Sequence, residues 1–389
     1  MNYHFMIDDK FFNNLIDDIE KVSTSESNQY YILSEKINSV HVSHPKAKWI
    51  GGSDKLIQIL NSITSEDRIF IHWYDLNIGK LILKIDKTIP LYVSLMGGEF
   101  YSEPLLFHRE WLFDKKTLQF FNRLFIYPKK WSKNPVLFLK QIRRIWLIKK
   151  RAKNDFKIKT ETIKRINYLL VGENMNKELS LVSKLYKTKK FKHLPFIFNQ
   201  NFDLAISLPI CKKESNSTVI QIGNSATYEN NHLDLLPIIQ RFGKEDININ
   251  IPLAYGSPIY ANEVKNHYSP LFNEKVKYIE DFVPKEEYVK KLQQVDICIM
   301  YHNRSQALGN CISLLTLGKK LYLKTNNPLW SLFKNIGVVV YDVNSIKSLT
   351  FQQFIEPLTK EEIESNILRL SATFSEKKRL SDLSEILRN

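Results

Sequence analysis

Two apolar runs in the C-terminal half of the chain are each followed by residues that suit a phosphate group. One run leads into Gly223, Asn224 and Ser225, and the other leads into His302, Arg304, Gln306, Gly309 and Asn310. Small residues let backbone N–H groups approach phosphate oxygens, an arginine binds them bidentately, and a following helix offers free N–H groups at its first turn. These types predict a diphosphate site, in which Gln306 reads a sugar or a base. His302 is either a ligand contact or a structural residue.

The first of these loops has a simpler alternative, because small residues also make an ordinary tight turn. It is not a Walker loop, since no Gly-Lys-Ser or Gly-Lys-Thr follows, and it lacks the glycines of the GxGxxG dinucleotide motif. The second loop, HNRSQALGN, is therefore the stronger functional signal. No DxD pattern for a divalent metal is present, and we expect Arg304 and helix N-termini to balance the phosphate charge without a metal or another cofactor.

The N-terminal half offers three side chains with acid or base chemistry near the ends of predicted strands. Glu99 follows Gly97 and Gly98 in LYVSLMGGEFY, and paired glycines permit a close approach of the backbone to a substrate. A carboxylate at that place is a candidate general base, and a hairpin turn with an exposed acid is the alternative. His72 and Asp75, in IFIHWYD, are the second candidates for this role.

The loops require strands that end at one edge of a sheet, and the apolar pattern supplies them. Short apolar runs alternate with segments of helical spacing, which is typical of a doubly wound parallel sheet. The C-terminal half is expected to contain strands at 219–222, 247–252, 276–279, 296–301, 320–323 and 337–341. The N-terminal half is expected to contain strands at 3–7, 30–33, 68–73, 91–95 and 166–171. The predicted fold class is therefore α/β, with two Rossmann-like domains.

The length of 389 residues suits two domains rather than one core. We expect an N-terminal domain over residues 1–205 and a C-terminal domain over 206–355, which carries the two loops of the expected diphosphate site. Residues 356–389 have helical spacing with charged faces, and we expect them to pack across the junction of the two domains.

The positive charge of the chain is concentrated in one region. Residues 111–195 hold 23 Lys or Arg and 5 Asp or Glu, a local net charge of +18, whereas the whole chain carries +15. Genome-wide lysine bias would raise the charge everywhere, so the concentration indicates a negatively charged partner.

The densest basic stretch, from Lys129 to Lys153, has ten basic residues and no acid. At helical spacing its apolar residues gather on one face and most of its charges on the other. One interpretation is a domain helix with a solvated basic side; the other is a helix that lies on an anionic lipid surface, and both can hold together. A nucleic-acid partner is disfavoured, because no DNA- or RNA-binding motif accompanies the charge. The residues expected to face the membrane are Lys140, Arg143, Arg144, Trp146, Lys149, Lys150 and Arg151.

No apolar run approaches the ~18 residues that a membrane span needs, and the N-terminus lacks the pattern of a signal peptide. The expectation is a cytoplasmic protein. Its three cysteines, Cys211, Cys298 and Cys311, form no CxxC pair, so neither a disulfide framework nor a zinc site is predicted.

Four short segments, in this order, resemble the C-terminal domain of glycosyltransferase family 56. They are Gly223-Asn224-Ser225, PLAYG at 252–256, HNRSQALGN at 302–310 and NNPLW at 326–330. GGEFY, with Glu99, is similar to a glycine-glycine-acid-aromatic-tyrosine element of that family, which has aspartate in place of this glutamate. The resemblance extends over residues 66–345. Known members are enterobacterial enzymes of common-antigen synthesis, which transfer 4-acetamido-4,6-dideoxygalactose from its TDP-linked form.

The resemblance implies a GT-B architecture, in which two Rossmann-like domains face a cleft. The N-terminal domain, 1–205, would bind the acceptor substrate, and the C-terminal domain, 206–355, would bind the nucleotide-sugar. It also implies inverting transfer from a nucleotide-sugar, with TDP favoured, to a polyprenyl-diphosphate-linked saccharide at the inner face of the membrane. The C-terminal loops would hold the donor diphosphate as leaving group, and Glu99 would deprotonate the acceptor hydroxyl. Tyr255, in PLAYG, would line the nucleotide pocket by analogy.

Two other classes of protein remain as alternatives. A GT-B enzyme that processes a nucleotide-sugar without transfer, such as an epimerase, would use the diphosphate site but not the basic amphipathic surface. A non-catalytic basic binding protein would use the charge and leave both loops without a function.

Overall fold

The computed structural model describes residues 1–36, 40–94, 111–126, 132–172, 175–188, 192–196, 198, 200–209, 211, 213 and 216–388. The chain divides into two compact units. The first unit comprises residues 1–104, 150–198 and 376–389, and the second comprises 105–149 and 199–375. We describe each unit by itself.

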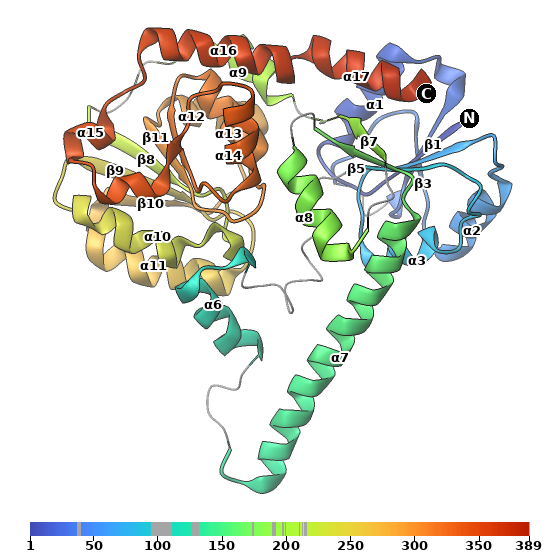
Figure 1. Ribbon diagram of the computed structural model, residues 1–389, viewed down its shortest axis with the longest axis horizontal. Helices are drawn as coiled ribbons and strands as arrows, with labels where there is room; N and C mark the ends of the chain where they lie inside the picture. The colour runs from blue at the N-terminus through green and yellow to red at the C-terminus, as the bar shows by residue number, and fades with distance from the viewer. Residues whose placement is uncertain are drawn as a thin grey trace. The chain divides into compact units, whose positions relative to one another are not determined.

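The first unit is built on a seven-stranded parallel sheet with the strand order β3-β2-β1-β4-β5-β6-β7 (Figure 1). This order, in which the chain reverses direction beside β1, is that of a Rossmann fold. The strands are β1 (Asn2–Met6), β2 (Asn28–Ile32), β3 (Ala47–Trp49), β4 (Arg68–Ile71), β5 (Leu91–Ser94), β6 (Tyr168–Val171) and β7 (Lys192–Pro195). Its helices include α1 (Phe12–Val22), α2 (Ser53–Ser62), α3 (Leu76–Ile82), α8 (Asn176–Tyr186) and α17 (Glu376–Arg388).

A row of stacked rings crosses this sheet from β2 to β6. Tyr30, His4, Phe70, Tyr92 and Tyr168 occupy successive paired positions of five neighbouring strands. Consecutive ring centroids lie 5.2, 4.8, 4.5 and 4.4 Å apart. Tyr30, Phe70 and Tyr92 of this row belong to the same buried cluster as apolar residues of α1 and α17, so these helices cover this face of the sheet. Packed rings of this size contribute much of the apolar area that stabilises the unit.

Helix α17 is held on the first unit by polar contacts as well. Arg379 donates to buried Asp18 of α1 over 2.7 Å. At the other end of α17, Arg68 donates to the carbonyl groups of Ile386 and Leu387 over 3.4 and 2.7 Å. These carbonyl groups lack partners within the helix, so a guanidinium is well placed to satisfy them.

The second unit contains a six-stranded parallel sheet with the order β10-β9-β8-β11-β12-β13. Figure 1 shows α10 and α11 on one face of this sheet and α12, α13 and α14 on the other, which makes the unit doubly wound. The strands are β8 (Thr218–Ile222), β9 (Ile247–Pro252), β10 (Val276–Ile279), β11 (Ile297–Met300), β12 (Lys320–Leu323) and β13 (Tyr341–Asp342). The helices on its faces are α10 (His232–Ile239), α11 (Pro258–Phe272), α12 (Lys285–Gln293), α13 (Leu308–Thr316) and α14 (Pro328–Asn335).

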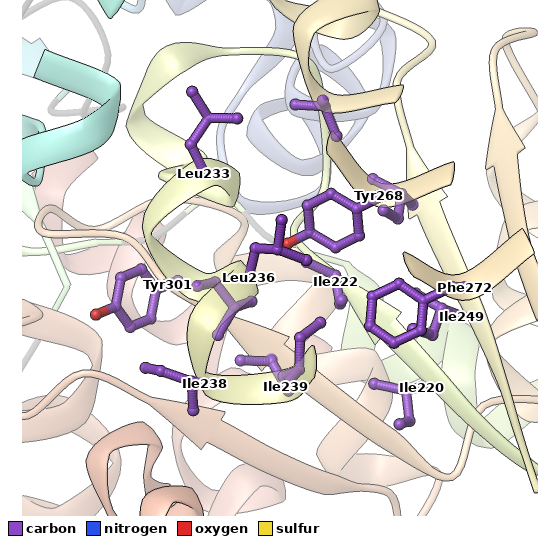
Figure 2. Packing of buried hydrophobic residues seen from close by; sticks show 14 of the residues in the cluster. Ile220, Ile222, Leu233, Leu236, Ile238, Ile239, Ile249, Tyr268, Phe272 and Tyr301 are labelled. Atoms are coloured by element: carbon purple, nitrogen blue, oxygen red, sulfur yellow. The ribbon is translucent and has the colours of Figure 1, made fainter. Parts of the chain in front are cut away.

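The main core of this unit lies between the sheet and the pair α10 and α11. Figure 2 shows Leu236 and Ile239 of α10 packed near Ile220 and Ile222 of β8, with rings of α11 beside them. Further helices, α9 (Asn201–Ser207), α15 (Phe351–Ile355) and α16 (Lys360–Phe374), complete the unit, and α16 packs on α9 and α13. Buried β-branched and leucine side chains on β8, β9, β11 and β12 explain the continuous apolar runs at these strands in the sequence.

The strand predictions for both halves are confirmed to within two residues at most ends. Three details differ. The run at 337–341 was expected to be a strand, but β13 includes only Tyr341 and Asp342. The short strands β3 and β7 were not predicted, because three or four residues with few apolar side chains give no clear alternation.

Segments from the middle of the sequence form α6 (Lys115–Phe121) and the long helix α7 (Pro135–Arg165). Residues 105–149 group with the second unit, whereas the expected boundary was at residue 205. The expected C-terminal segment is also divided, because α16 belongs to the second unit and α17 to the first. Within the described residues, no helix combines the length and the apolar character that a bilayer span requires.

Candidate functional site

The candidate site lies in the second unit, at the carboxyl ends of β8 and β11. These strands are neighbours, and the helices that follow them, α10 and α13, lie on opposite faces of the sheet (Figure 1). The loops that follow these strands meet at this edge, which is the usual ligand position in open α/β sheets, and we call this meeting point of the loops the crevice.

The loop after β8 turns sharply at Gly223, whose φ is +66°. Asn224 and Ser225 are buried, and the side chain of Asn224 donates to the hydroxyl group of Tyr255 over 2.8 Å. Ser225 Oγ lies 3.1 Å from Thr227 Oγ1. The loop is thus an ordered cluster of small polar groups rather than a plain turn.

The loop after β11 makes direct contacts with the first loop. Gln306 donates to Asn224 Oδ1 over 3.2 Å and to Thr227 Oγ1 over 3.0 Å. Arg304, only 8% exposed, lies 3.4 Å from the carboxylate of Glu229 and donates to Ser305 O over 2.9 Å. The structure therefore brings together Asn224, Arg304 and Gln306, which the sequence had placed in one crevice.

Glu229 is a site residue that sequence reasoning missed. It follows the first loop in YENNH, where an acid gives no motif signal. The ion pair with Glu229 keeps the guanidinium of Arg304 at the crevice and neutralises part of its positive charge. A phosphate can compete for this cation, because a dianion binds a guanidinium more strongly than a single long contact does.

A third loop closes against the first. Ala226 donates its N–H to Tyr255 O over 2.7 Å, and Ser257 donates its N–H back to Ala226 O over 3.0 Å. Gly256 between them has a φ of +117°, and a Cβ there would lie 2.4 Å from the Ala226 carbonyl carbon. Tyr255 remains about half exposed at this edge. Only glycine fits at 256, so PLAYG is a structural requirement of the crevice.

Other predicted ligand residues have packing roles. His302 is fully buried behind the loops, and its Nε2 lies 2.9 Å from Asn230 Oδ1. A Cβ on Gly309 would meet the side chain of Asn201 at 2.9 Å, so this glycine lets α13 approach α9. Asn310 donates to Tyr288 of α12 over 3.2 Å. These three residues support the crevice from within the unit.

The candidate bases of the first unit have different outcomes. Gly97, Gly98 and Glu99 lie outside the described residues. His72 is buried, and its two ring nitrogens lie 3.0 Å from His4 Nδ1 and 3.1 Å from Ser94 Oγ. Burial holds the pKa of His72 well below its usual value, so a proton is not readily held there. An engaged, buried imidazole does not suit the role of a general base toward a substrate hydroxyl.

Asp75 also has a structural role. Its Oδ1 accepts from the backbone N–H groups of Asn77 and Ile78, each over 2.8 Å, and so caps the N-terminus of α3. Such caps stabilise a helix by satisfying donors that have no partner in the first turn. The sequence signal for a base at this position was in fact a helix-capping signal.

The start of α6 is fastened to the loops of the crevice, which the sequence did not indicate. Asp114 accepts from Lys324 over 2.7 Å and from Asn303 over 2.9 Å, and Asn231 Oδ1 accepts from the Asp114 N–H over 2.8 Å. Asp234 of α10 accepts from the first N–H groups of α6 at Lys116 and Thr117. Asn231 and Asn303 are chain neighbours of Asn230 and His302, so adjacent residues of the two loops serve the crevice and α6.

The residues expected to face a membrane all lie on α7. Lys140, Arg143, Arg144, Trp146, Lys149, Lys150 and Arg151 are exposed. Within the described residues, no group of His, Cys, Asp or Glu has the arrangement of a metal site.

Comparison with known families decides the identity. The model of the family described as 4-alpha-L-fucosyltransferase, glycosyl transferase group 56, matches residues 163–374, more than half of the chain. The chain belongs to this family. The match includes all three loops of the crevice and most of the second unit of this family 56 member.

Solved structures give the fold of the whole chain. Sucrose-phosphate synthase from Thermosynechococcus elongatus has a TM-score of 0.62 at 9% identity, over 100% of this chain and 98% of that one. Anabaena HepE in complex with UDP and glucose has a TM-score of 0.60 at 10% identity, and a glycosyltransferase from Rickettsia africae one of 0.59 at 13%. Each of these two comparisons covers 100% of this chain and 99% of the other. The fold is GT-B, and the family 56 protein is a glycosyltransferase that transfers a sugar from a nucleotide-sugar.

Proposed function

We propose that the crevice of the second unit binds the nucleoside diphosphate of the donor, with TDP favoured and a deoxy-acetamido sugar attached. The observation that carries this proposal is the convergence of Arg304, Gln306 and the loop 223–227 at one sheet edge. A buried guanidinium beside a turn rich in N–H and hydroxyl donors suits two linked phosphates. The structure of HepE with UDP and glucose, which shares the fold, is consistent with such a donor.

The proposed reaction is an inverting, metal-independent transfer. The acceptor hydroxyl attacks the anomeric carbon, the bond from that carbon to the diphosphate oxygen breaks, and the nucleoside diphosphate leaves. Arg304 and the donors of the loops stabilise the charge that develops on the leaving oxygen. Glu99 is the proposed base that takes the proton of the acceptor hydroxyl.

The proposed acceptor is a saccharide linked to a polyprenyl diphosphate, presented at the inner face of the membrane in cell-surface polysaccharide synthesis. The support for this acceptor is α7. Between Val136 and Leu147 its first half exposes seven large apolar side chains, among basic residues and without an acid. Exposed apolar and basic side chains on one helix suit an interface with anionic lipid. The enzyme would then be peripheral on that membrane.

Nucleotide binding tests the donor site. The purified protein is titrated with TDP, UDP and GDP, with and without magnesium, and the shift in melting temperature is measured. We expect a magnesium-independent rise with one nucleotide class, which Arg304→Ala abolishes. Arg369→Ala, which removes an exposed arginine of α16, is the matched control and should bind as the wild type does. If no nucleotide stabilises the wild type, the proposed donor site is wrong.

Transfer itself tests the base. With donor and acceptor in hand, Glu99→Gln should lower kcat by about 100-fold or more, because general-base catalysis contributes on that order. Nucleotide binding of this variant should be unchanged. An unchanged kcat would exclude Glu99 as the base and leave the donor site unaffected.

A further inference from the structure

Asn230 joins the two loops of the crevice through its side-chain amide. It is 1% exposed and ends the 3-10 turn Tyr228–Asn230. Its Oδ1 lies 2.9 Å from the backbone N of Asn224 and 2.9 Å from His302 Nε2. Its Nδ2 donates to Ser225 Oγ over 3.1 Å and to Thr227 Oγ1 over 2.9 Å. The Asn230 amide therefore accepts hydrogen bonds at its oxygen from both loops and donates from its nitrogen to the first loop.

Chemistry fixes the orientation of this amide. The N–H group of Asn224 only donates, so the atom of Asn230 that faces it is the carbonyl oxygen. The same oxygen faces His302 Nε2, and an amide oxygen only accepts, so Nε2 carries the proton. The neutral form of His302 is therefore the Nε2-protonated tautomer, with the lone pair on Nδ1.

The surroundings of His302 oppose a second proton. Burial is the largest cause that holds the pKa of His302 well below its usual value, and the charges of Arg304, His232 and Lys324 act in the same direction. Arg304 forms an ion pair with Glu229, and Lys324 forms one with Asp114, so the two carboxylates neutralise part of these positive charges. His302 is thus a neutral hydrogen-bond donor at ordinary pH rather than an acid or base for catalysis.

Gly223 gives independent evidence that this contact is built into the loop. A Cβ at Gly223 would lie 2.5 Å from Asn230 Oδ1 and 2.8 Å from His232 Nε2. The turn thus leaves room for the Asn230 oxygen at the position where any other residue would place a side chain.

We propose that Asn230 is a positioning residue, which fixes His302 as the Nε2-protonated neutral tautomer and so holds loops 223–227 and 301–306 ready for the donor diphosphate. The role in donor binding rests on the proposed function, whereas the tautomer of His302 does not. Asn230 acts through the loops and does not itself contact the reacting atoms.

The tautomer is measured first, on the wild-type protein without ligand. Two-dimensional nitrogen-15 spectra of histidine side chains distinguish Nε2–H from Nδ1–H, and a His302→Gln variant assigns the signal. We expect His302 to stay Nε2-protonated and neutral from pH 8 to pH 6. An Nδ1-protonated ring, or a ring that titrates near pH 6.5, would overturn the proposal whatever the protein binds.

The second experiment changes the charge of Asn230 with little change of shape. In Asn230→Asp a carboxylate faces His302, which raises the pKa of the ring, and an added negative charge faces the donor site. The probe is the nucleoside diphosphate that stabilises the wild type. We divide the dissociation constant of the variant by that of the wild type at each pH, because the titration of the phosphate affects both proteins equally. We expect this ratio to fall as the pH is lowered through the pKa that nitrogen-15 spectra give for His302 in the variant, because protonation of the ring cancels the added charge.

Asn266→Asp is the matched control, because it makes the same change at an exposed position of α11. Its ratio should not vary with pH. A ratio for Asn230→Asp that stays flat through this measured pKa would contradict the proposal. If Asn230→Asp does not fold, Asn230→Ala should raise the donor KM about tenfold with a smaller change in kcat, because the one hydrogen bond to His302 and the bonds that order loop 223–227 are lost. An unchanged KM in that variant would overturn the positioning role.

Discussion

Asp18 and Arg379 form a buried ion pair between helices that are 361 residues apart in the sequence. Oδ2 of Asp18 and Nε of Arg379 are separated by 2.7 Å, and the two side chains are 1% and 4% exposed. A second pair, Lys21 with Glu376, joins the same two helices over 2.6 Å at the surface, where both side chains are about half exposed. The interface of α1 and α17 therefore contains one buried and one exposed ion pair.

Arg379→Met should destabilise the first unit by about 3–5 kcal/mol, because Asp18 would remain buried without its partner. Urea unfolding measures the loss, monitored by hydrogen exchange of peptides from α1 and β1. The double variant Asp18→Leu with Arg379→Met should regain most of it, since apolar replacements of a buried pair are often neutral. Glu376→Gln, the exposed control, removes the surface pair but leaves Lys21 beside Asp18, and it should cost less than ~1 kcal/mol. Equal effects of Arg379→Met and Glu376→Gln would contradict the assignment.

The stability of the first unit should fall in mild acid. Burial lowers the pKa of His4 to about 4 and that of His72 well below 6.5. Both rings are neutral in the folded state, whereas the unfolded chain takes up their protons below about pH 6.5. The free energy of unfolding should therefore be flat above pH 7 and should decrease from pH 6.5 toward pH 4. The slope is about 1.4 kcal/mol per pH unit for each histidine.

Hydrogen exchange of β1 and β4 peptides, corrected for the intrinsic rate at each pH, tests this prediction. His4→Gln should reduce the slope of the unfolding free energy against pH by about 1.4 kcal/mol per pH unit, the contribution of one histidine. His267→Gln, on the surface of α11 in the second unit, should leave the slope unchanged. A wild-type profile without any decrease between pH 6.5 and pH 4.5 would show that the two rings are not held neutral by the fold.

Gly256→Ala should damage the crevice more than its backbone angle alone explains. A positive φ strains alanine by about 1–3 kcal/mol, and at Gly256 the added Cβ also collides with the backbone of Ala226. Gly52 provides the matched control, because its φ is +92° but nothing lies within 4 Å of an added Cβ. Gly256→Ala should therefore lower the melting temperature and weaken nucleotide binding, whereas Gly52→Ala should affect only stability. Equal nucleotide binding by both variants would contradict the close approach of the two loops.

Helix α7 should bind anionic vesicles in a salt-dependent way. The measurement is co-sedimentation with vesicles of phosphatidylglycerol and, separately, of phosphatidylcholine. Arg143→Gln with Arg144→Gln should weaken binding to phosphatidylglycerol by ~2 kcal/mol, since each basic residue near such a surface contributes about 1 kcal/mol. Trp146→Ser should weaken it through loss of apolar contact.

The controls for α7 come from α16. Lys360→Gln and Leu368→Ser change residues that are strongly exposed on that helix and should have little effect. Binding that is equal on both lipids, or that the α7 variants do not change, would remove the membrane interpretation. Tighter binding to DNA than to phosphatidylglycerol vesicles would favour a nucleic-acid partner instead.

The apolar pattern was sufficient to predict both sheets, because buried parallel strands are continuous apolar runs whatever their neighbours are. The pattern also located the loops after β8 and β11, since Gly223, Arg304 and Gln306 follow two of these apolar runs. It was not sufficient for Asn230 and Glu229, whose roles depend on partners 72 and 75 residues away. The same limit explains Asp75, because a carboxylate that caps a helix and one that acts as a base look alike in sequence.

The position of α17 in the chain also constrains the order of folding during synthesis. Leu383, Ile386 and Leu387 of this helix belong to the buried cluster that contains the ring row of the first unit. The ribosome makes these residues only after every residue of the second unit has been made. The second unit can therefore complete its core before the first unit, which keeps an open apolar face until α17 is added. That face is the one that a chaperone would meet on the nascent chain.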